Sequence, residues 1–426
     1  MIARIEPKRI VIATIGSLGD LHPCLALALE LQRRGHHITV ASTAFYRQQV
    51  EIHNLNFHSV RPDWDPTSPG IIRQCDDLRH GPEVLFRNLI LPHLRDTYSD
   101  LLTVAAGADL MIAGELVYAA PLVAEKLRVR WASAILSPCS FFSSHDPSIL
   151  VNVPWLMQFR KAGSHAYSAA LNLCRLATRH WWNPVRDLRR ELGLRTHCDP
   201  VFRDKFSPDL VLALFSRCLA QPQADWPPQT VQAGFVYHDQ ADTTQIPELA
   251  AFLASGDLPI VFTLGSTAVH NPGDFYQVSV LAARQLGRRA ILLGAKCMPQ
   301  NAGAISPEIL ALPYAPYSRV FPHAAAIVHQ GGSGTTGQAL RAGRPMLIVP
   351  YGWDQPDNGA RVQRLGAGLC LSRSDYSAKS AAPVLSQLLT DATFAGCAAD
   401  AAAFLRCEGG ITQACDAVDA VLHRTS

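Results

Sequence analysis

"RIVIATIGSLGDLHPCLALALELQRRGHHITVAS", Arg9 to Ser42, has the pattern of a β-α-β unit. Its apolar, largely β-branched run Ile10–Ile15 is typical of a strand that is buried on both faces. A glycine-bearing turn follows, then a helix predicted from about Pro23 to Arg34 and a second strand over Ile38–Ala41. Because a crossover helix joins strands that pair in parallel, this stretch predicts the start of a parallel sheet.

The same pattern returns in the second half of the chain. "LPIVFTLGSTAVHNP", Leu258 to Pro272, indicates a buried strand with a Gly-Ser-Thr turn, and a helix is predicted over Asp274–Leu286. The runs "RAILLG", "AAIVHQGG" and "PMLIVP" predict further strands. The sequence therefore predicts an α/β fold in which two Rossmann-like, doubly wound parallel-sheet domains face each other across a cleft.

A stretch rich in Pro, Gln and Asp separates the two halves and marks a boundary. We expect one domain over residues 1–238, a linker over 239–257 and a second domain over 258–405. Residues 406–426 have the pattern of a last helix, which we expect to pack back on the first domain. In sheets of this kind, ligands bind at the carboxyl ends of the strands.

The composition is that of an ordinary globular protein, with 426 residues, 48% of them hydrophobic and 17% charged, and a net charge of +3. No Lys/Arg run is long enough to indicate nucleic-acid binding. The 11 cysteines form no CxxC pair, so we expect no metal site, and an odd, unpatterned set is typical of a reducing cytosol. Since no apolar run has the length of a signal peptide or a membrane span, we expect a cytoplasmic location.

The stretch "HQGGSGTTGQALRAGRPMLIVPYGWDQPDN", His329 to Asn358, begins as an anion site would. A strand leads into a loop of glycines and hydroxyls and then into a helix, whose N-terminus presents free N–H groups and a partial positive charge. The loop residues concerned are Gly331, Gly332, Ser333, Gly334, Thr335 and Thr336. His329 could donate to an oxyanion or, if protonated, pair with it. The plainer alternative is a glycine-rich turn that caps a helix beside a buried histidine.

Asp354 and Gln355 follow the next predicted strand. A carboxylate and an amide offer acceptors and donors to vicinal hydroxyls, and the alternative role of Asp354 is to cap the next helix. A phosphate loop one strand away from a polyol site indicates a sugar nucleotide.

The stretch from Tyr314 to Val362, "YAPYSRVFPHAAAIVHQGGSGTTGQALRAGRPMLIVPYGWDQPDNGARV", resembles the donor-binding signature of family-1 glycosyltransferases, the UDP-glycosyltransferase superfamily with the GT-B fold. "HQGGSGTT", "DQPDN" and the N-terminal "IGSLGDLHP" are similar to the bacterial and sterol-type branch, including the rhamnosyltransferases of rhamnolipid synthesis. The resemblance implies a nucleotide-sugar co-substrate, UDP- or dTDP-hexose, and no other cofactor.

The resemblance also assigns roles to individual positions. Tyr314 stands in for a tryptophan that stacks on the base, and Ala315 contacts the base edge. The diphosphate contacts fall to His329, Ser333, Gly334, Thr335 and, from another strand, Ser266, with Gly331 and Gly332 in the same loop and Gly19 across the cleft. Trp353, Asp354 and Gln355 would hold the donor sugar.

Gln338 is a departure from the plant members, which place a glutamate there for the ribose hydroxyls. An amide is a weaker acceptor than a carboxylate. This favours a dTDP donor, whose sugar lacks the 2′-hydroxyl, without excluding UDP.

Transfer with inversion needs a base for the acceptor hydroxyl. Plant relatives use a histidine in "GHxxP", where this chain has Gly19-Asp20-Leu21-His22-Pro23, so Asp20 is the expected base and His22 the reserve candidate. Helix capping is the alternative role of Asp20. Glu115 stands where plant enzymes keep the acid that orients their histidine, and here it could raise the pKa of the base or line the acceptor pocket.

The acceptor is expected on the N-terminal domain. Residues 141–184 are rich in aromatics, which favours a hydrophobic small-molecule acceptor such as a lipid hydroxy acid, a phenolic or a sterol-like molecule. Ordinary core packing and peripheral contact with a membrane are the alternatives for this segment. The sequence indicates no oligomeric state.

Three rival functions compare unfavourably with this hypothesis. "GSLGD" is not the GxGxxG of a nicotinamide-dependent enzyme, and no acidic residue ends the second strand. Asp63-Trp64-Asp65 is formally a DxD metal motif, but it follows "HSVRP" and is interpreted as a loop. A binding protein of the same fold without turnover is the third rival, and the presence of Asp20, His329, Asp354 and Gln355 argues against it.

Overall fold

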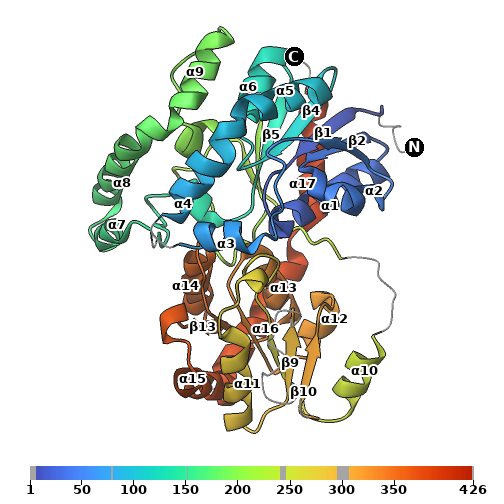
Figure 1. Ribbon diagram of the computed structural model, residues 1–426, viewed down its shortest axis with the longest axis vertical. Helices are drawn as coiled ribbons and strands as arrows, with labels where there is room; N and C mark the ends of the chain where they lie inside the picture. The colour runs from blue at the N-terminus through green and yellow to red at the C-terminus, as the bar shows by residue number, and fades with distance from the viewer. Residues whose placement is uncertain (1–5, 78–79, 151, 240–245, 295–306, 425–426) are drawn as a thin grey trace.

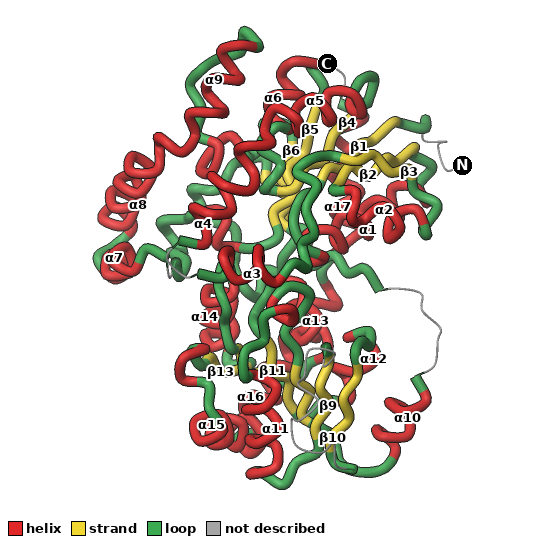
Figure 2. The backbone as a smooth tube through the Cα atoms, viewed as in Figure 1, coloured by secondary structure: helices red, strands yellow, loops and turns green. Residues whose placement is uncertain are grey.

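A computed structural model describes residues 6–77, 80–150, 152–239, 246–294 and 307–424. Figure 1 shows two lobes stacked along the long axis of the molecule, each built around its own sheet. In the tube view, loops from both lobes gather between them (Figure 2). The predicted α/β fold with two facing Rossmann-like domains is confirmed.

The N-terminal domain has a seven-stranded sheet in the order β3-β2-β1-β4-β5-β6-β7, and the paired strands run in parallel. The strands are β1 (Arg9–Ala13), β2 (His37–Ser42), β3 (Asn56–Ser59), β4 (Leu110–Gly114), β5 (Arg130–Ile135), β6 (Leu210–Ala213) and β7 (Thr230–Gln232). The helices are α1 (Leu18–Arg33), α2 (Arg47–Glu51), α3 (Pro69–Cys75), α4 (Gly81–Glu83), α5 (Leu94–Ala105), α6 (Ala120–Leu127), α7 (Pro154–Met157), α8 (Ser164–Thr178) and α9 (Asn183–Glu191).

The C-terminal domain has a six-stranded parallel sheet in the order β10-β9-β8-β11-β12-β13. The strands are β8 (Ile260–Phe262), β9 (Ala290–Leu293), β10 (Ile309–Leu312), β11 (Ala326–His329), β12 (Met346–Ile348) and β13 (Gly368–Cys370). The helices are α10 (Pro247–Ala254), α11 (Phe275–Gln285), α12 (Tyr317–Val320), α13 (Ser333–Ala342), α14 (Gln355–Leu365), α15 (Ala378–Thr390) and α16 (Ala392–Cys407), and a last helix, α17 (Gly410–Leu422), follows them in the chain.

Alternate residues of the central strand β1 serve the two faces of the first sheet. Ile10 and Ile12 join the core beneath α1 and α17, whereas Val11 and Ala13 join the core beneath α5 and α6. Because both faces are covered by helices, the strand is apolar at every position after the exposed Arg9, as the sequence indicated.

Helix α1 begins at Leu18, five residues before the predicted start. The cause is a capping box: the Gly19 N–H donates to Ser17 Oγ (3.1 Å), and the Ser17 N–H donates to Asp20 Oδ2 (2.8 Å). Pro23 lies inside the helix, in its second turn, where it cannot donate the usual hydrogen bond to the carbonyl of Gly19. The helix N-terminus therefore stands at the end of β1, in the cleft.

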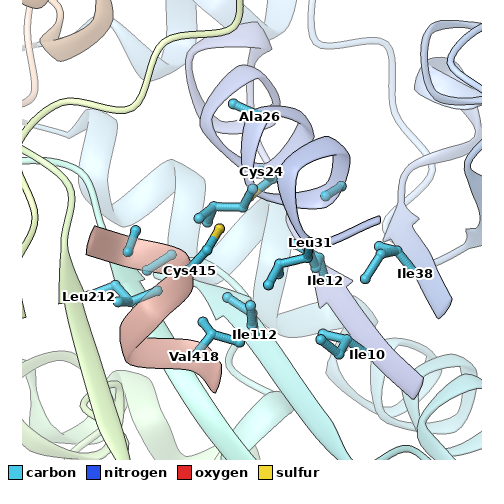
Figure 3. Packing of buried hydrophobic residues seen from close by; sticks show 14 of the residues in the cluster. Ile10, Ile12, Cys24, Ala26, Leu31, Ile38, Ile112, Leu212, Cys415 and Val418 are labelled. Carbon is cyan, nitrogen blue, oxygen red and sulfur yellow. The ribbon is translucent and has the colours of Figure 1, made fainter. Parts of the chain in front are cut away.

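The last helix, α17, lies in the N-terminal lobe (Figure 1). Cys415 and Val418 pack beside Ile112 of β4 and Leu212 of β6, as Figure 3 shows. On the surface, Arg34 pairs with Asp419 of the same helix (2.7 Å). The first strand and the last helix thus belong to the same domain, so the chain passes from the N-terminal lobe to the C-terminal lobe and back.

The stretch expected to be a linker is only partly irregular. Pro247–Ala254 forms helix α10, with proline at its first position and Leu249 buried, while residues 240–245 lie outside the described residues. Among the described residues, no single helix is long and apolar enough to cross a bilayer. The bent pair Ala378–Thr390 and Ala392–Leu422 reaches that length only together.

Candidate active site

Each sheet has one point at which the strand order reverses, and candidate residues stand at both. In the first sheet this point lies between β1 and β4, which lead to Asp20 and Glu115. In the second it lies between β8 and β11, which lead to Ser266 and the loop after His329. Crevices at such switch points are where open α/β sheets bind ligands.

Asp20 is half-buried at the start of α1, and its carboxylate accepts from the Ser17 N–H (2.8 Å) and the Ser17 hydroxyl (3.1 Å). Burial raises the pKa of Asp20 to about 6, although these two hydrogen bonds oppose the shift, and the charges of Glu115 and Asp354 add to it. A carboxyl with a pKa near the working pH is suited to general base catalysis.

Asp20 and Glu115 belong to the N-terminal domain, whereas Asp354 belongs to the C-terminal one. Burial raises the pKa of Asp354 to about 6 as well, with a further contribution from Glu115. The three carboxyl groups are thus close enough to influence one another across the domain interface. This brings the expected base and the expected sugar-binding carboxylate into one site.

The main chain of Leu136 connects Glu115 with the glycine-rich loop. Its N–H donates to Glu115 Oε1 (3.4 Å), and its carbonyl accepts from the Ser333 hydroxyl (2.8 Å). Glu115 also pairs with the buried Lys205 (3.1 Å). Glu115 therefore stands beside the base, and it also lines a mainly apolar cavity with Tyr118 and Trp131.

The side chain of His22 faces other histidines. Its ring lies 5.4 Å from the ring of His238, which is 5.1 Å from that of His53. Burial, helped by His238, lowers the pKa of His22 to about 4. A weaker base that faces other histidines is a poorer candidate for proton abstraction than Asp20.

His329 requires a correction. The sequence suggested that its ring donates to a phosphate or carries a charge, but the ring is fully buried. Nδ1 accepts from the Gly331 N–H (3.0 Å), Nε2 faces Met346 Sδ (3.4 Å), and burial lowers the pKa to about 3. The neutral ring thus holds the loop in shape, and in this structure it is not itself placed to contact an anion.

The N-terminus of α13 is open. Among the described residues no side chain caps it, because its N-cap is Gly332, and Gly331 adopts a φ of +92° that allows the loop to pass Ile348 and the backbone of Gln355. Within the described part of the chain, the buried Thr336 Oγ1 and Gln330 Oε1 have no hydrogen-bond partner. Free helix N–H groups, with Ser333, Gly334 and Thr335 in the first turn, form a candidate anion site.

The turn after β8 lies against this loop. A Cβ on Gly265 would come within 2.2 Å of Gln330 Nε2 and 3.2 Å of Thr335 Oγ1. This places the neighbouring Ser266 beside the anion site. Along the same edge, Tyr314 is 58% exposed, enough for stacking on a base, while Ala315 is buried.

The loop after β12 is held tightly. Gln355 Oε1 accepts from the N–H groups of Tyr351 (2.7 Å) and Gly352 (3.2 Å), which leaves its amide nitrogen for a ligand. Trp353 has a φ of +60°, a rare conformation for a bulky residue and one often found at functional sites. Asp354 stands at the N-cap of α14, yet its carboxylate accepts from Asn358 (2.8 Å) instead of capping the helix.

Gln338 lies apart from the loop residues, one turn further along α13. Its amide donates to Asp239 Oδ1 (3.3 Å), and Arg341 pairs with the same carboxylate (2.6 Å). A carboxylate from the chain segment between the domains therefore stands beside the amide.

No pattern in the sequence indicated the contacts that fasten the two domains together. Arg361 of α14 is buried and binds Asp357 (2.7 Å), Ser148 (3.2 Å) and, across the interface, Asp146. Asp357 also accepts from the Ile149 N–H (2.8 Å). The loop 137–150 of one domain is thus clamped to the helix that begins at the sugar site of the other.

The remaining candidates fall outside the site. Asp63 accepts from the Ala44 N–H (3.1 Å) and Asp65 from the Thr67 N–H (2.8 Å), so the DxD motif forms loop contacts. Among the described residues, no cluster of His, Cys, Asp and Glu could hold a metal ion. In the aromatic segment, Phe141 and Trp182 are buried, whereas Trp155 and Phe159 are exposed.

Comparison with known proteins agrees with this geometry. Residues 10–138 match the glycosyltransferase family 28 N-terminal domain, and residues 290–408 match the C-terminal domain of erythromycin biosynthesis protein CIII-like proteins. O-mycaminosyltylonolide 6-deoxyallosyltransferase of Streptomyces fradiae is 30% identical over 96% of both chains. Sterol 3-beta-glucosyltransferase of Neosartorya fischeri is 28% identical over 97% of this chain, which spans only 29% of that longer protein.

Solved structures show the same fold. CalG4, the calicheamicin glycosyltransferase, superposes with a TM-score of 0.73 at 19% identity, covering 99% of this chain and 100% of that one. VinC, solved in complex with dTDP, superposes with a TM-score of 0.70 at 19% identity over 98% and 100%. The chain therefore belongs to the GT-B glycosyltransferases of the UDP-glycosyltransferase superfamily, in the branch that contains bacterial natural-product and sterol enzymes.

Proposed function

We propose that the protein is an inverting, metal-independent glycosyltransferase that moves a hexose from a UDP- or dTDP-sugar to a hydroxyl of a hydrophobic small molecule. One observation carries the proposal: Asp20 and Asp354, on opposite domains, lie close enough for the charge of Asp354 to raise the pKa of Asp20, in a site that also contains an open helix N-terminus. A base, a sugar-binding carboxylate and an anion site on facing walls are what the reaction requires.

In the proposed mechanism, Asp20 takes the proton of the acceptor hydroxyl while its oxygen attacks the anomeric carbon. The bond to the diphosphate breaks on the opposite side of the sugar, which inverts the configuration. The N–H groups at the start of α13, that of Ser333 among them, and the hydroxyl of Thr335 stabilise the leaving diphosphate, so the charge is met by preorganised donors. The buried His329 supports the loop and is not given a charged role.

The donor site is assigned to the C-terminal domain. Tyr314 would stack on the base, Ser266 and the first turn of α13 would hold the diphosphate, and Asp354 with Gln355 would hold the sugar. For the nucleotide we favour dTDP, since Gln338 offers an amide and Asp239 is already paired with Arg341. The structural relative VinC was solved in complex with dTDP, and this supports the preference for dTDP proposed here.

The acceptor is proposed to be a hydrophobic alcohol or phenol. The names of the relatives point to a macrolide and to sterols as their acceptors.

A panel of UDP- and dTDP-sugars in a thermal-shift assay tests the donor assignment. The donor that raises the melting temperature is then incubated with macrolide, sterol, phenolic and lipid hydroxy-acid acceptors, and the products are identified by mass spectrometry, with and without a chelator. A product of inverted configuration that forms in the presence of the chelator is expected. If no nucleotide sugar raises the melting temperature, the proposed function is wrong. Binding without nucleotide release would identify a non-catalytic protein.

A further inference from the structure

Asn358 is the side chain that joins the separate parts of the site. It lies one turn into α14, and its side chain is fully buried. Its Nδ2 donates to the carbonyl of Gly331 in the glycine-rich loop (2.9 Å) and to Asp354 Oδ2 (2.8 Å). Its Oδ1 faces the hydroxyl of Ser137 from the other domain (3.5 Å).

This arrangement uses the chemistry of an amide fully. Both protons of Nδ2 are engaged, one with the loop expected to carry the diphosphate and one with the carboxylate expected to carry the sugar. A carboxylate at this position would have no proton for either contact, and an alkyl group would leave the Gly331 carbonyl and Asp354 without this donor.

A second set of contacts holds α14 without involving Asn358. Arg361, one turn further on, is buried and ion-paired with Asp357 (2.7 Å) and with Asp146 of the facing domain. Because the helix is clamped there, removing the Asn358 amide is expected to change the local contacts of Asp354 without releasing the helix.

We propose that Asn358 is a positioning residue, which fixes Asp354 and the glycine-rich loop in register and keeps Asp354 ionised for the hydroxyls of the donor sugar. The inference rests on the proposed function, because it assigns Asp354 to the sugar.

The surroundings of Asp354 make this support necessary. Glu115 at the end of β4 and Asp20 on α1 face it with like charges, and the buried thiol of Cys139 faces it from the loop 137–150. Burial raises the pKa of Asp354 to about 6, and the hydrogen bonds from Asn358 and Ser333 are the contacts that oppose this shift. Loss of the Asn358 donor must therefore raise the pKa further.

The test measures the affinity of the purified protein for dTDP-glucose and UDP-glucose, and for dTDP and UDP alone, by titration calorimetry between pH 5 and pH 8. The ratio of the two affinities isolates the contact with the sugar from the contact with the diphosphate. For the wild type, this ratio is expected to fall below about pH 6, as Asp354 takes up a proton. In Asn358→Ala, the midpoint is expected about one pH unit higher.

Three further variants sharpen the result. The isosteric Asn358→Asp keeps the volume but adds a like charge, so its midpoint should lie above that of Asn358→Ala. Asp354→Asn should leave only the pH dependence that comes from the terminal phosphate of free dTDP and UDP, whose second pKa is about 6. Gln232→Ala is the matched control, because Gln232 is a buried amide that donates to two main-chain carbonyls (3.2 Å and 2.9 Å) away from the site, and its midpoint should equal that of the wild type.

Equal midpoints for the wild type, both Asn358 variants and Gln232→Ala would overturn the inference, since a purely structural residue lowers affinity at every pH alike. Should Asn358→Ala fail to fold, the isosteric Asn358→Asp decides alone. If the wild type binds dTDP and UDP but shows no added contact with either sugar, the assignment of Asp354 fails, and the inference with it. Failure of the wild type to bind any of these nucleotides overturns the proposed function itself.

Discussion

The turns after β1 and after β11 look alike in sequence but end in opposite ways. Both leave a central strand, contain glycine and a serine, and lead directly into a helix. In the first, Ser17 and Asp20 close the helix N-terminus with a capping box. In the second, Gly332 is the N-cap and, among the described residues, no side chain closes the helix. Because the N-terminus of α1 is already capped by its own carboxylate and that of α13 is not, we propose that the diphosphate binds at α13 and that the base stands on α1.

The largest expected effect comes from the turn after β1, where Ser17 and Asp20 cap the helix. Asp20→Asn preserves the acceptor for the Ser17 N–H but removes the base, so turnover should fall by about 10²–10⁴. Donor affinity, measured by calorimetry, should change little because the donor binds the other turn. A large loss of donor affinity together with normal turnover would reverse the roles of the two turns.

Closing the open turn should have the next largest effect. Gly332→Asp places a carboxylate at an N-cap whose φ of −61° and ψ of 146° any residue can adopt, at the cost of moving the flexible Gln330 amide. The new cap should leave the melting temperature unchanged or slightly higher. Affinity for dTDP or UDP should fall by about 100-fold, because the new carboxylate accepts from the free N–H groups of α13 and repels the negatively charged diphosphate. Unchanged nucleotide binding in a folded Gly332→Asp variant would show that the diphosphate lies elsewhere.

A third variant should distinguish the contribution of the sugar contacts to affinity from that of the diphosphate contacts. Asp354→Asn keeps the shape of the loop but weakens hydrogen bonds to the sugar hydroxyls by about 1.5–3 kcal/mol, or about 10- to 100-fold in affinity. The affinity for the nucleotide without its sugar should stay within a few-fold. Equal losses for both ligands would mean that Asp354 shapes the phosphate loop instead.

The smallest effect concerns pH. Because Asp20 acts only when ionised and its pKa is raised to about 6, turnover should be full above that pH and fall as the pH drops below it. Glu115→Gln removes a like charge and frees Lys205, and both changes lower the pKa of Asp20. The acid limb of the rate profile should then move to lower pH by a few tenths of a unit. A shift to higher pH would contradict the assigned electrostatics.

The fold and the members of the site were largely predictable, because they depend on local patterns. Apolar runs gave the strands, and strand-loop-helix junctions gave the positions of Asp20, Glu115 and the loop after His329. The early start of α1 could also have been predicted, because Ser17 and Asp20 have the spacing of a capping box. The prediction started the helix at Pro23 because proline favours a first turn.

Two features could not be read from the sequence. The direction of the His329 ring depends on Met346, which lies 17 residues away, and on the fold of the Gly331 backbone. The clamp between Asp146 and Arg361 joins residues 215 positions apart, with no periodicity to indicate it. Such contacts depend on how the two domains meet, and no local pattern encodes that.

A crystal structure of the protein with bound dTDP or UDP tests the central claim most directly. We expect diphosphate oxygens on the main-chain N–H groups at the start of α13, with the carboxylate of Asp20 facing the leaving phosphate across the cleft. A diphosphate bound at α1, or one held by a His329 ring that has turned out of the core, would contradict it.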